Sequence, residues 1–364
     1  MFAKRIAYTI TLTIAYLLTT CAIAQPRNML RYEQHTASTG QVYFELGAWR
    51  LRNIAANGQT YQTIDMSATG LTERKGWAEL PYMNACLQLD AQTQATARIV
   101  KCDYDEIELQ HPLLPSRGVI YRRDNPDSIP YRIAPESMLS SQYPETAYEL
   151  GEPFTFRTER GINLRIYPFC YNAKEQKLRI YRRIVVEIAQ RPSAAAINPL
   201  KTTSTATAQN IGMYKSMFLN YTNATKSRAL PVNREYGDIL VIATSRDSAA
   251  IMPYVQWKRE KGFSVTLSIL PKGSNVSETI RNTYKYNRNL MFVQLVGDWG
   301  DLNGNTYASV PADPSNGCVE GNDNYPDIAI GRFSCSTPEE LTAQVDKTIN
   351  YERTPDNSNG TTLP

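Results

Sequence analysis

A cysteine nucleophile and a histidine base can together carry out covalent catalysis. Both residue types are scarce in the later part of this 364-residue chain. The histidines are His35 and His111, so a three-histidine metal site within the chain is excluded. A cysteine nucleophile needs a nearby base or positive charge to form a thiolate at neutral pH. Because no histidine follows His111, we expect Cys335, which comes just after an apolar run, to be a buried core thiol.

A second group of residues that could do chemistry is the acidic stretch of residues 297–331. It contains Asp, Glu and Asn residues but no Lys or Arg. Carboxylates in one loop repel each other unless they are solvated or bridged by a cation, and Ca²⁺ takes about six to eight oxygen ligands. We predict a structural calcium site with Asp298, Asp301, Asp323 and Asp327 as ligands, and a solvated acidic loop is the alternative. Asp298, at the end of one predicted strand, and Asp327, at the start of the next, are the leading candidates.

The turn at residues 244–247 follows a predicted strand but holds no glycine. Phosphate-binding loops need glycines that let backbone N–H groups approach the phosphate, and neither a G-x-G-x-x-G nor a P-loop pattern is present. The charge is balanced, with 39 Lys and Arg against 35 Asp and Glu, whereas nucleic-acid binders usually show a basic stripe. We therefore predict neither a nucleotide cofactor nor a nucleic-acid partner.

Alternating strands and helices must position the acidic stretch. Short apolar runs predict buried strands over residues 238–243, 263–270, 290–296 and 327–330. Between them we predict one helix from Asp247 to about residue 261 and another from Ser274 or Asn275 to about residue 287. This order of elements predicts a mainly parallel sheet with right-handed crossovers.

The last predicted helix begins with a capping box. Thr337 is the N-cap, Pro338 occupies the first helical position, and Glu340 is placed to bond back to the cap. We expect this helix to run to about Arg353.

Residues 25–190 have a different pattern, rich in short alternating or β-branched runs. Strands are predicted at residues 41–46, 97–100, 154–157 and 162–166. A polar turn at residues 172–176 predicts a hairpin between residues 165–171 and 177–188. Residues 191–236 are rich in Thr, Ala, Ser and Asn and predict a linker, with a short ordered piece at residues 213–219.

The first 24 residues have the pattern of a secretory signal peptide. A positive start and an apolar stretch lead to a small-residue signal, so the bond between Ala24 and Gln25 is the predicted cleavage point. A membrane anchor and a lipoprotein modified at Cys21 are the alternatives. The stretch is short for a span, no later run is long enough for one, and Cys21 lacks the usual small residue before it. We predict an exported protein without a transmembrane span.

Cysteine number and charge add two further points. Five cysteines remain after the signal, an odd number with no C-x-x-C pair, which indicates neither a disulfide framework nor a zinc site. Residues 229–364 carry a net charge of −4 and residues 25–228 a net charge of +6. Opposite charges favour docking of the two parts, and chance drift in composition is the alternative explanation.

Ordered motifs in both parts resemble the gingipain-type cysteine peptidase family. After residue 229 they are Val255-Gln-Trp257-Lys258, Leu295-Val-Gly-Asp298 and residues 321–325, 327–335 and 346–353. Before residue 229, Glu152-Pro-Phe, Arg160-Gly161 and Leu178-Arg-Ile-Tyr181 are similar to the propeptide of that family.

The resemblance implies an α+β chain with a β-rich prodomain followed by part of a caspase-like α/β domain with a mainly parallel sheet. It implies a secreted zymogen of a cysteine endopeptidase that cuts protein or peptide substrates after Arg or Lys and is stabilised by Ca²⁺. The family cuts its propeptide near the place of Arg228, so Arg228 and Ala229 are expected to flank the processing bond. The catalytic His-Gly and Cys of the family lie further downstream. We therefore expect a chain truncated before the dyad and inactive alone, with no catalytic residue assigned.

The expected domains are a signal peptide (1–24), a β-rich propeptide-like domain (25–190), a linker with the processing site (191–236) and the N-terminal part of the catalytic domain (237–364). The alternative function is a non-enzymatic, prodomain-like inhibitor or escort that binds a cognate peptidase domain. In that case a basic side chain within residues 117–123 would fill the specificity pocket of the enzyme. An ordinary solvated basic loop is the other explanation of that stretch.

Overall fold

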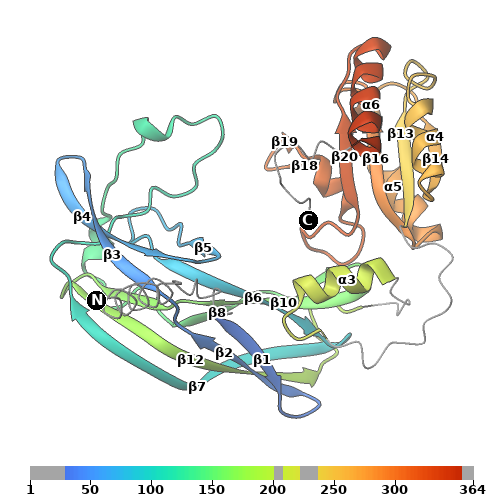
Figure 1. The fold of residues 1–364 in the computed structure, drawn as a ribbon. Coiled ribbons are helices and arrows are strands. Elements are labelled where there is room, and N and C mark those ends of the chain that lie inside the picture. Colours follow the sequence, from blue (N-terminus) through green and yellow to red (C-terminus); the bar gives the residue numbers. More distant parts are fainter. Residues whose placement is uncertain (1–28, 201–207, 222–236, 355–364) are drawn as a thin grey trace, which may run out of the picture.

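The computed structural model describes residues 29–200, 208–221 and 237–354. They form an N-terminal half of strands (residues 29–200), a short helix (residues 208–217) and a C-terminal half of strands and helices (residues 237–354), with the helix beside the place where the halves meet (Figure 1). The predicted signal cleavage at Ala24 and Gln25, and the predicted processing at Arg228 and Ala229, lie outside the described residues. Within the described residues, none of the helices has the length and apolar character needed to cross a membrane.

Two antiparallel sheets build the N-terminal half. The first sheet contains β1 (Leu30–Gln34), β2 (Thr39–Glu45), β7 (Thr93–Glu108), β11 (Phe169–Asn172) and β12 (Lys177–Pro192). The second contains β5 (Gly70–Leu71), β6 (Pro81–Leu89), β8 (Tyr148–Leu150), β9 (Phe154–Phe156) and β10 (Glu159–Ile166). Alternate residues of β2 are buried, as a half-covered strand requires. Apolar residues from both sheets share one core, which is the packing of a β-sandwich.

Smaller elements complete this half. A hairpin joins β3 (Trp49–Ala56) to β4 (Gln59–Met66). The long connection after β7 contains the 3₁₀ helix η1 (Pro126–Ser128) and the helix α2 (Pro135–Met138), and it rises away from the sheets (Figure 1). The helix α3 (Ala208–Met217) follows and packs through Tyr214, with Phe218 just beyond its end, against the aromatic side chains of β9.

The C-terminal half is a three-layer α/β unit. Its parallel sheet has the order β14 (Ser264–Ile269), β13 (Asp238–Ala243), β16 (Leu290–Val296) and β20 (Ala329–Phe333). The helices α4 (Met252–Glu260) and α6 (Pro338–Arg353) share an apolar cluster with one face, and α5 (Ser277–Tyr286) does so with the other. Every residue of β13 is buried, which explains why its sequence is apolar after Asp238.

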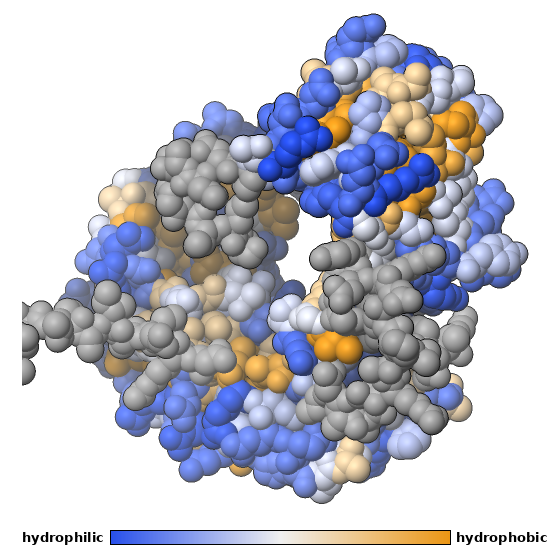
Figure 2. Space-filling view, turned by 45° about the vertical axis from the view of Figure 1, so that its right-hand side comes forward, coloured by the Kyte–Doolittle hydropathy of each residue, from blue (hydrophilic) through white to orange (hydrophobic). Residues whose placement is uncertain are grey.

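The loops of this half contain two pairs of short strands. β15 (Ser274–Asn275) pairs with β17 (Leu302–Asn303), and β18 (Thr306–Tyr307) pairs with β19 (Val310–Pro311). The 3₁₀ helix η3 (Asp313–Gly317) follows them. Hydrophobic residues reach the surface of the C-terminal half between hydrophilic ones in the upper right part of Figure 2.

The predicted fold class is confirmed, since a β-rich half precedes an α/β half with a parallel sheet. The start of the first helix was predicted wrongly. Asp247 is fully buried rather than an N-cap, and α4 begins only at Met252, where Pro253 suits a first turn because it lacks an N–H.

Two further elements differ in detail from the sequence prediction. In the predicted hairpin, β11 does pair with β12, but Arg165 and Ile166 belong to β10 in the other sheet. In the predicted capping box, Thr337 caps the N–H of Glu340, whereas the Glu340 carboxylate accepts from the N–H of Ser336 rather than of Thr337.

Candidate functional site

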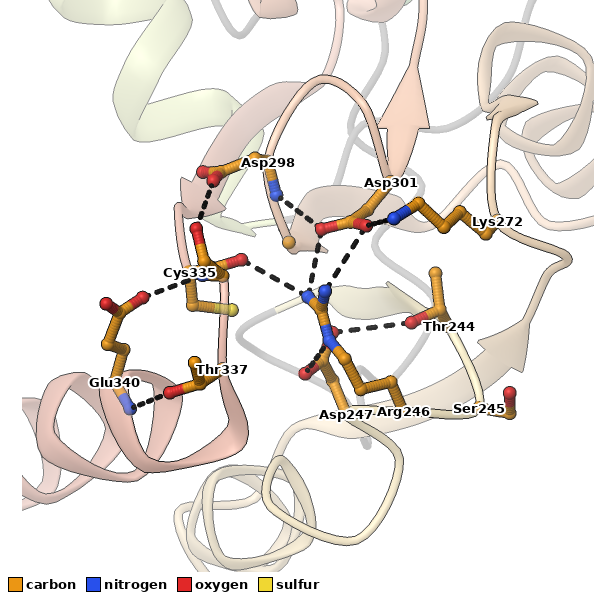
Figure 3. A network of polar contacts seen from close by, with 12 residues as sticks. Thr244, Ser245, Arg246, Asp247, Lys272, Asp298, Asp301, Cys335, Thr337 and Glu340 are labelled. Carbon is orange, nitrogen blue, oxygen red and sulfur yellow. Dashed lines mark hydrogen bonds and ion pairs between the residues drawn. The ribbon is translucent and has the colours of Figure 1, made fainter.

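The carboxyl edge of the parallel sheet gathers four charged residues and one cysteine from three strand ends. Arg246 and Asp247 follow β13, Asp298 and Asp301 follow β16, and Cys335 follows β20 (Figure 3). Parallel strands end at the same edge, which is why residues distant in sequence meet there.

Arg246 lies at the centre of this network. Its guanidinium donates to both oxygens of Asp247, at 3.0 and 2.8 Å, and to both oxygens of Asp301, at 3.3 and 2.9 Å. It also donates to the carbonyl oxygen of Cys335 at 3.2 Å. Lys272 lies 3.3 Å from Asp301. Burial disfavours the charged form of Asp301, but the hydrogen bonds from Arg246 and Lys272 outweigh it and lower the pKa of this carboxyl group.

Asp298 lies at the same edge of the sheet and forms hydrogen bonds with other partners. Its carboxylate accepts a hydrogen bond from the hydroxyl of Ser336 at 3.0 Å, and its N–H donates to Asp301 at 3.2 Å. Ser336 is next to the N-cap of α6, so these bonds join the loop after β16 to the start of that helix. The network therefore holds together the loops that leave the carboxyl edge.

Cys335 is buried in the core that α4 and α6 share, as the sequence predicted. Burial raises the pKa of its thiol, and the charge of Asp247 adds to that rise. A thiol that resists ionisation is a poor nucleophile. His35 and His111 belong to the N-terminal half, so the described residues assemble no Cys–His pair at this edge.

Asp327 lies at the opposite edge of the sheet from Asp298. The strands β16 and β20 are parallel, with Phe292 beside Ala329 and Val296 beside Phe333. Asp298 follows the end of β16 and Asp327 precedes the start of β20, so about five residues of strand, roughly 17 Å, separate them. Asp298 and Asp327 therefore cannot bind one ion together, because the strand direction places them at opposite edges of the sheet.

The four aspartates are instead held by protein donors. Arg246 and Lys272 bind Asp301, while backbone N–H groups bind Asp323 and Asp327. In the described part of the chain, no three His, Cys, Asp or Glu side chains lie close enough to hold one metal ion. These residues do not fit a shared calcium site, and calcium binding stays a prediction from the resemblance.

Asp323 and Asp327 contact the N-terminal half. The N–H and hydroxyl of Thr155 donate to Asp323 at 2.8 and 3.1 Å, and the N–H of Arg157 donates to Asp327 at 2.6 Å. The two halves also meet where Asn163 donates to the hydroxyl of Tyr325 at 2.5 Å. These bonds link residues more than 160 positions apart in the sequence.

An aromatic cluster fills the centre of this contact. The ring of Phe154 stacks on that of Tyr325 with their centroids 3.8 Å apart, and the ring of Phe218, 6.4 Å away, is also nearly parallel to it. Phe154, Tyr214 and Phe218 are at most 2 % exposed. The cluster thus combines β9, the segment with α3 and the loop before β20, and it buries apolar surface that each part would otherwise expose.

A polar cavity of about 360 Å³ adjoins the cluster. Both halves line it, with Glu149, Asn163 and Arg165 on one side and Asn322 and Asp323 on the other.

The electrostatics of the contact centre on Asp327, which is 3 % exposed. Burial raises the pKa of this carboxyl group to about 7, although hydrogen bonds from the N–H groups of Arg157 and Val319 lower it. Burial therefore outweighs the donors, and the charged carboxylate is costly to keep at this place.

Sequence reasoning missed Thr155 and Arg157 as contact residues and placed Asp323 and Asp327 in a metal site. The available signal was the sequence of β9 itself, where aromatic residues alternate with Thr155 just before a turn that begins with a charged Arg157. An arginine at that turn position is unusual and could have been singled out.

Comparisons with known proteins match both parts of the chain to one peptidase family. The family model Propeptide_C25 matches residues 25–228, and the model described as Peptidase family C25 matches residues 233–363. Gingipain R2 of Porphyromonas gingivalis is 30 % identical over 348 residues, which cover 91 % of this chain and 46 % of the relative. Lys-gingipain of the same species is 23 % identical over 340 residues, covering 85 % and 19 %. The chain thus spans about half the length of the first relative.

Among solved structures, the complex of the Porphyromonas gingivalis RgpB pro- and mature domains is 25 % identical. It has a TM-score of 0.48, and the match covers 54 % of this chain and 98 % of that chain.

Proposed function

Because this chain belongs to peptidase family C25, with the propeptide of the family followed by the first part of its catalytic domain, we propose that it belongs to the secreted zymogen of a gingipain-type cysteine endopeptidase. In this proposal the N-terminal half is the propeptide and the C-terminal half is the opening part of the peptidase domain. Proteolysis is the proposed activity of the whole protein, and cleavage after Arg or Lys is its finer part, which rests on the resemblance.

The observation that carries this proposal is the contact between the halves. Stacking of Phe154 on Tyr325 and the hydrogen bonds of Thr155 and Arg157 join β9 to the loop before β20. A propeptide must stay bound to its peptidase domain to keep it latent, and a buried aromatic centre surrounded by hydrogen bonds is typical of a stable interface. The contact supports a propeptide that binds its own peptidase domain.

Export and calcium are further parts of the proposal. The pattern of residues 1–24 supports export, and the predicted signal cleavage follows Ala24. Stabilisation by Ca²⁺ rests on the resemblance alone, since Asp298, Asp301, Asp323 and Asp327 have protein partners.

Processing tests the zymogen proposal directly. We expect an arginine-specific peptidase to cut the chain after Arg228 and leave Ala229 as the new N-terminus, because the predicted bond lies between the two matched family regions. N-terminal sequencing of the products gives the position of the cut. Arg228→Gln should abolish this product, while the neighbouring control Lys226→Gln should leave it unchanged. An intact bond between Arg228 and Ala229 in the matured protein would contradict the predicted processing site.

The alternative function, an inhibitor or escort that acts on a separate peptidase, draws support from the loop that contains η1. Arg122 and Arg123 are exposed there, and Val119 and Tyr121 are about 60 % exposed beside them. If this loop fills the specificity pocket of another enzyme, the purified chain should inhibit a gingipain-type peptidase. Replacing Arg122 and Arg123 together by alanine should then raise the inhibition constant at least tenfold, whereas Arg52→Ala should not. Equal inhibition by all three proteins would rule out this loop.

A further inference from the structure

The turn between β9 and β10 has an unusual residue at its tip. Phe156 pairs with Glu159, so Arg157 and Thr158 form a two-residue hairpin turn. Arg157 has φ = 57°, a left-handed conformation that hairpin turns usually assign to Gly, Asn or Asp. A bulky residue is strained in this conformation because its Cβ crowds the following carbonyl oxygen, so the local sequence opposes the turn that it forms.

The guanidinium of Arg157 is buried against the C-terminal half. Arg157 is 4 % exposed. Its Nη1 donates to the carbonyl oxygen of Asp327 at 2.6 Å, and its Nη2 donates to the carbonyl oxygens of Leu290 at 3.1 Å and Arg288 at 3.3 Å. The ring of Tyr284 lies 6.0 Å from its Cζ. Three carbonyls and one aromatic face therefore surround a single cation.

The backbone around Asp327 shapes this surrounding. One oxygen of Asp327 accepts from the N–H of Arg157, and the other accepts from the N–H groups of Val319 at 2.9 Å and Glu320 at 2.8 Å. The Asp327 side chain thus fixes the loop whose own carbonyl binds the guanidinium. Arg288 also faces the Tyr284 ring, at 4.6 Å, but Glu320 pairs with its charge.

A stable fold would not need this arrangement. The Nε of Arg157 is buried and has no hydrogen-bond partner among the described residues. An unsatisfied buried donor and a left-handed arginine each destabilise the chain, and such features persist where they serve a function. The contacts that offset them all come from the C-terminal half.

We propose that the C-terminal half carries a guanidinium-binding cradle at the amino edge of its sheet, and that Arg157 anchors the N-terminal half by filling it. The cradle consists of the carbonyls of Arg288, Leu290 and Asp327 with the ring of Tyr284. This inference rests on the proposed function, because it explains how a propeptide stays bound. The ligand class is a planar guanidinium, and an open cradle would accept an arginine side chain of another protein.

The geometry favours arginine over lysine. A guanidinium presents donors in a fixed planar fork, so it reaches three carbonyls at once, whereas an ammonium is a compact point charge. We therefore expect Arg157→Lys to lose most of the binding that Arg157 provides, even though the charge remains.

The test uses the full chain with a protease recognition sequence inserted between Arg228 and Ala229. After cleavage, the dissociation constant of the two pieces is measured by analytical ultracentrifugation over a concentration series. Arg157→Gly removes the guanidinium and also suits the left-handed turn, so the turn itself is not disturbed. Hydrogen bonds of a charged group are stronger than those of a neutral group, and a loss of about 1.4 kcal/mol corresponds to tenfold weaker association. We expect Arg157→Gly to weaken association at least tenfold.

Chemical rescue separates a cradle from a general loss of packing. Ethylguanidinium at millimolar concentration should restore much of the association of Arg157→Gly, while ethylammonium should not. The matched control is Arg182→Ala, which removes an exposed arginine of the N-terminal half that pairs with Asp105 and should change nothing.

The outcomes are distinct. Tight association of the wild-type pieces with equally tight association of Arg157→Gly would overturn the anchor alone. Weak association of Arg157→Gly that ethylguanidinium and ethylammonium restore equally, or not at all, would overturn the cradle. Wild-type pieces that never associate would overturn the proposed function and the anchor together.

Discussion

Arg246→Ala is expected to lower the free energy of unfolding of the C-terminal half by about 3 kcal/mol, the lower end of the loss for a buried ion pair, because the Arg246 side chain is 33 % exposed while its partners are buried. Asp247 is fully buried and Asp301 is 5 % exposed, and both bind the same guanidinium. Without it, two carboxylates lie close together away from water. Urea denaturation followed by tryptophan fluorescence measures the loss.

Lys272→Ala is the matched control. Lys272 also lies beside Asp301, but its side chain is 73 % exposed, so we expect a loss of less than about 1 kcal/mol. Adding Asp301→Asn to Arg246→Ala should recover part of the stability, since it removes one unpaired charge. Equal losses for Arg246→Ala and Lys272→Ala would contradict the central place of Arg246.

The effect of Arg246→Ala should also depend on pH. The bonds from Arg246 and Lys272 lower the pKa of Asp301 against the effect of burial. A lowered pKa contributes stability that is present above the ordinary Asp value of about 3.9 and is lost as the pH falls. The difference between wild type and Arg246→Ala should therefore shrink as the pH falls below about 4.

Phe154→Ala is expected to cost about 3–4 kcal/mol, the range for a buried aromatic side chain. Phe154 is 1 % exposed and packs against the rings of Tyr325 and Phe218. Its removal opens a cavity where three separate segments meet, so the contact between the halves should weaken together with the fold. Urea denaturation measures the loss of stability, and the rate of proteolysis at the contact gives a second readout.

The control for this prediction is Tyr286→Ala. Tyr286 is an aromatic residue of α5 but is 84 % exposed, so its loss should stay within about 0.5 kcal/mol. A loss for Phe154→Ala no larger than that of the control would mean that the aromatic cluster does not hold the halves together.

Much of the C-terminal half could be predicted from sequence because its signals are local. The run that follows Asp238 in β13 is apolar because both faces of the strand are covered, and Thr337 with Pro338 marks the start of α6. Cys335 was expected to be buried because no base could activate it. The opposite positions of Asp298 and Asp327 also followed from a parallel sheet, but the metal hypothesis did not apply that rule.

The contact between the halves could not be predicted in the same way. Asp323 and Asp327 looked unneutralised because residues 297–331 contain no Lys or Arg. Their partners are instead Thr155 and Arg157, about 170 positions earlier. The turn at Arg157 is opposed by its local conformational preference, so only tertiary contacts explain it. Distant partners of this kind leave no periodic pattern in one sequence.

The central claim is that the N-terminal half binds the C-terminal half as a propeptide binds its peptidase domain. The most direct test is to cleave the full chain at a protease site inserted between Arg228 and Ala229 and to apply it to a size-exclusion column at about micromolar concentration, where a stable complex remains associated. We predict that both pieces elute together at the volume of the uncut chain. Elution as two separate folded pieces would contradict the account.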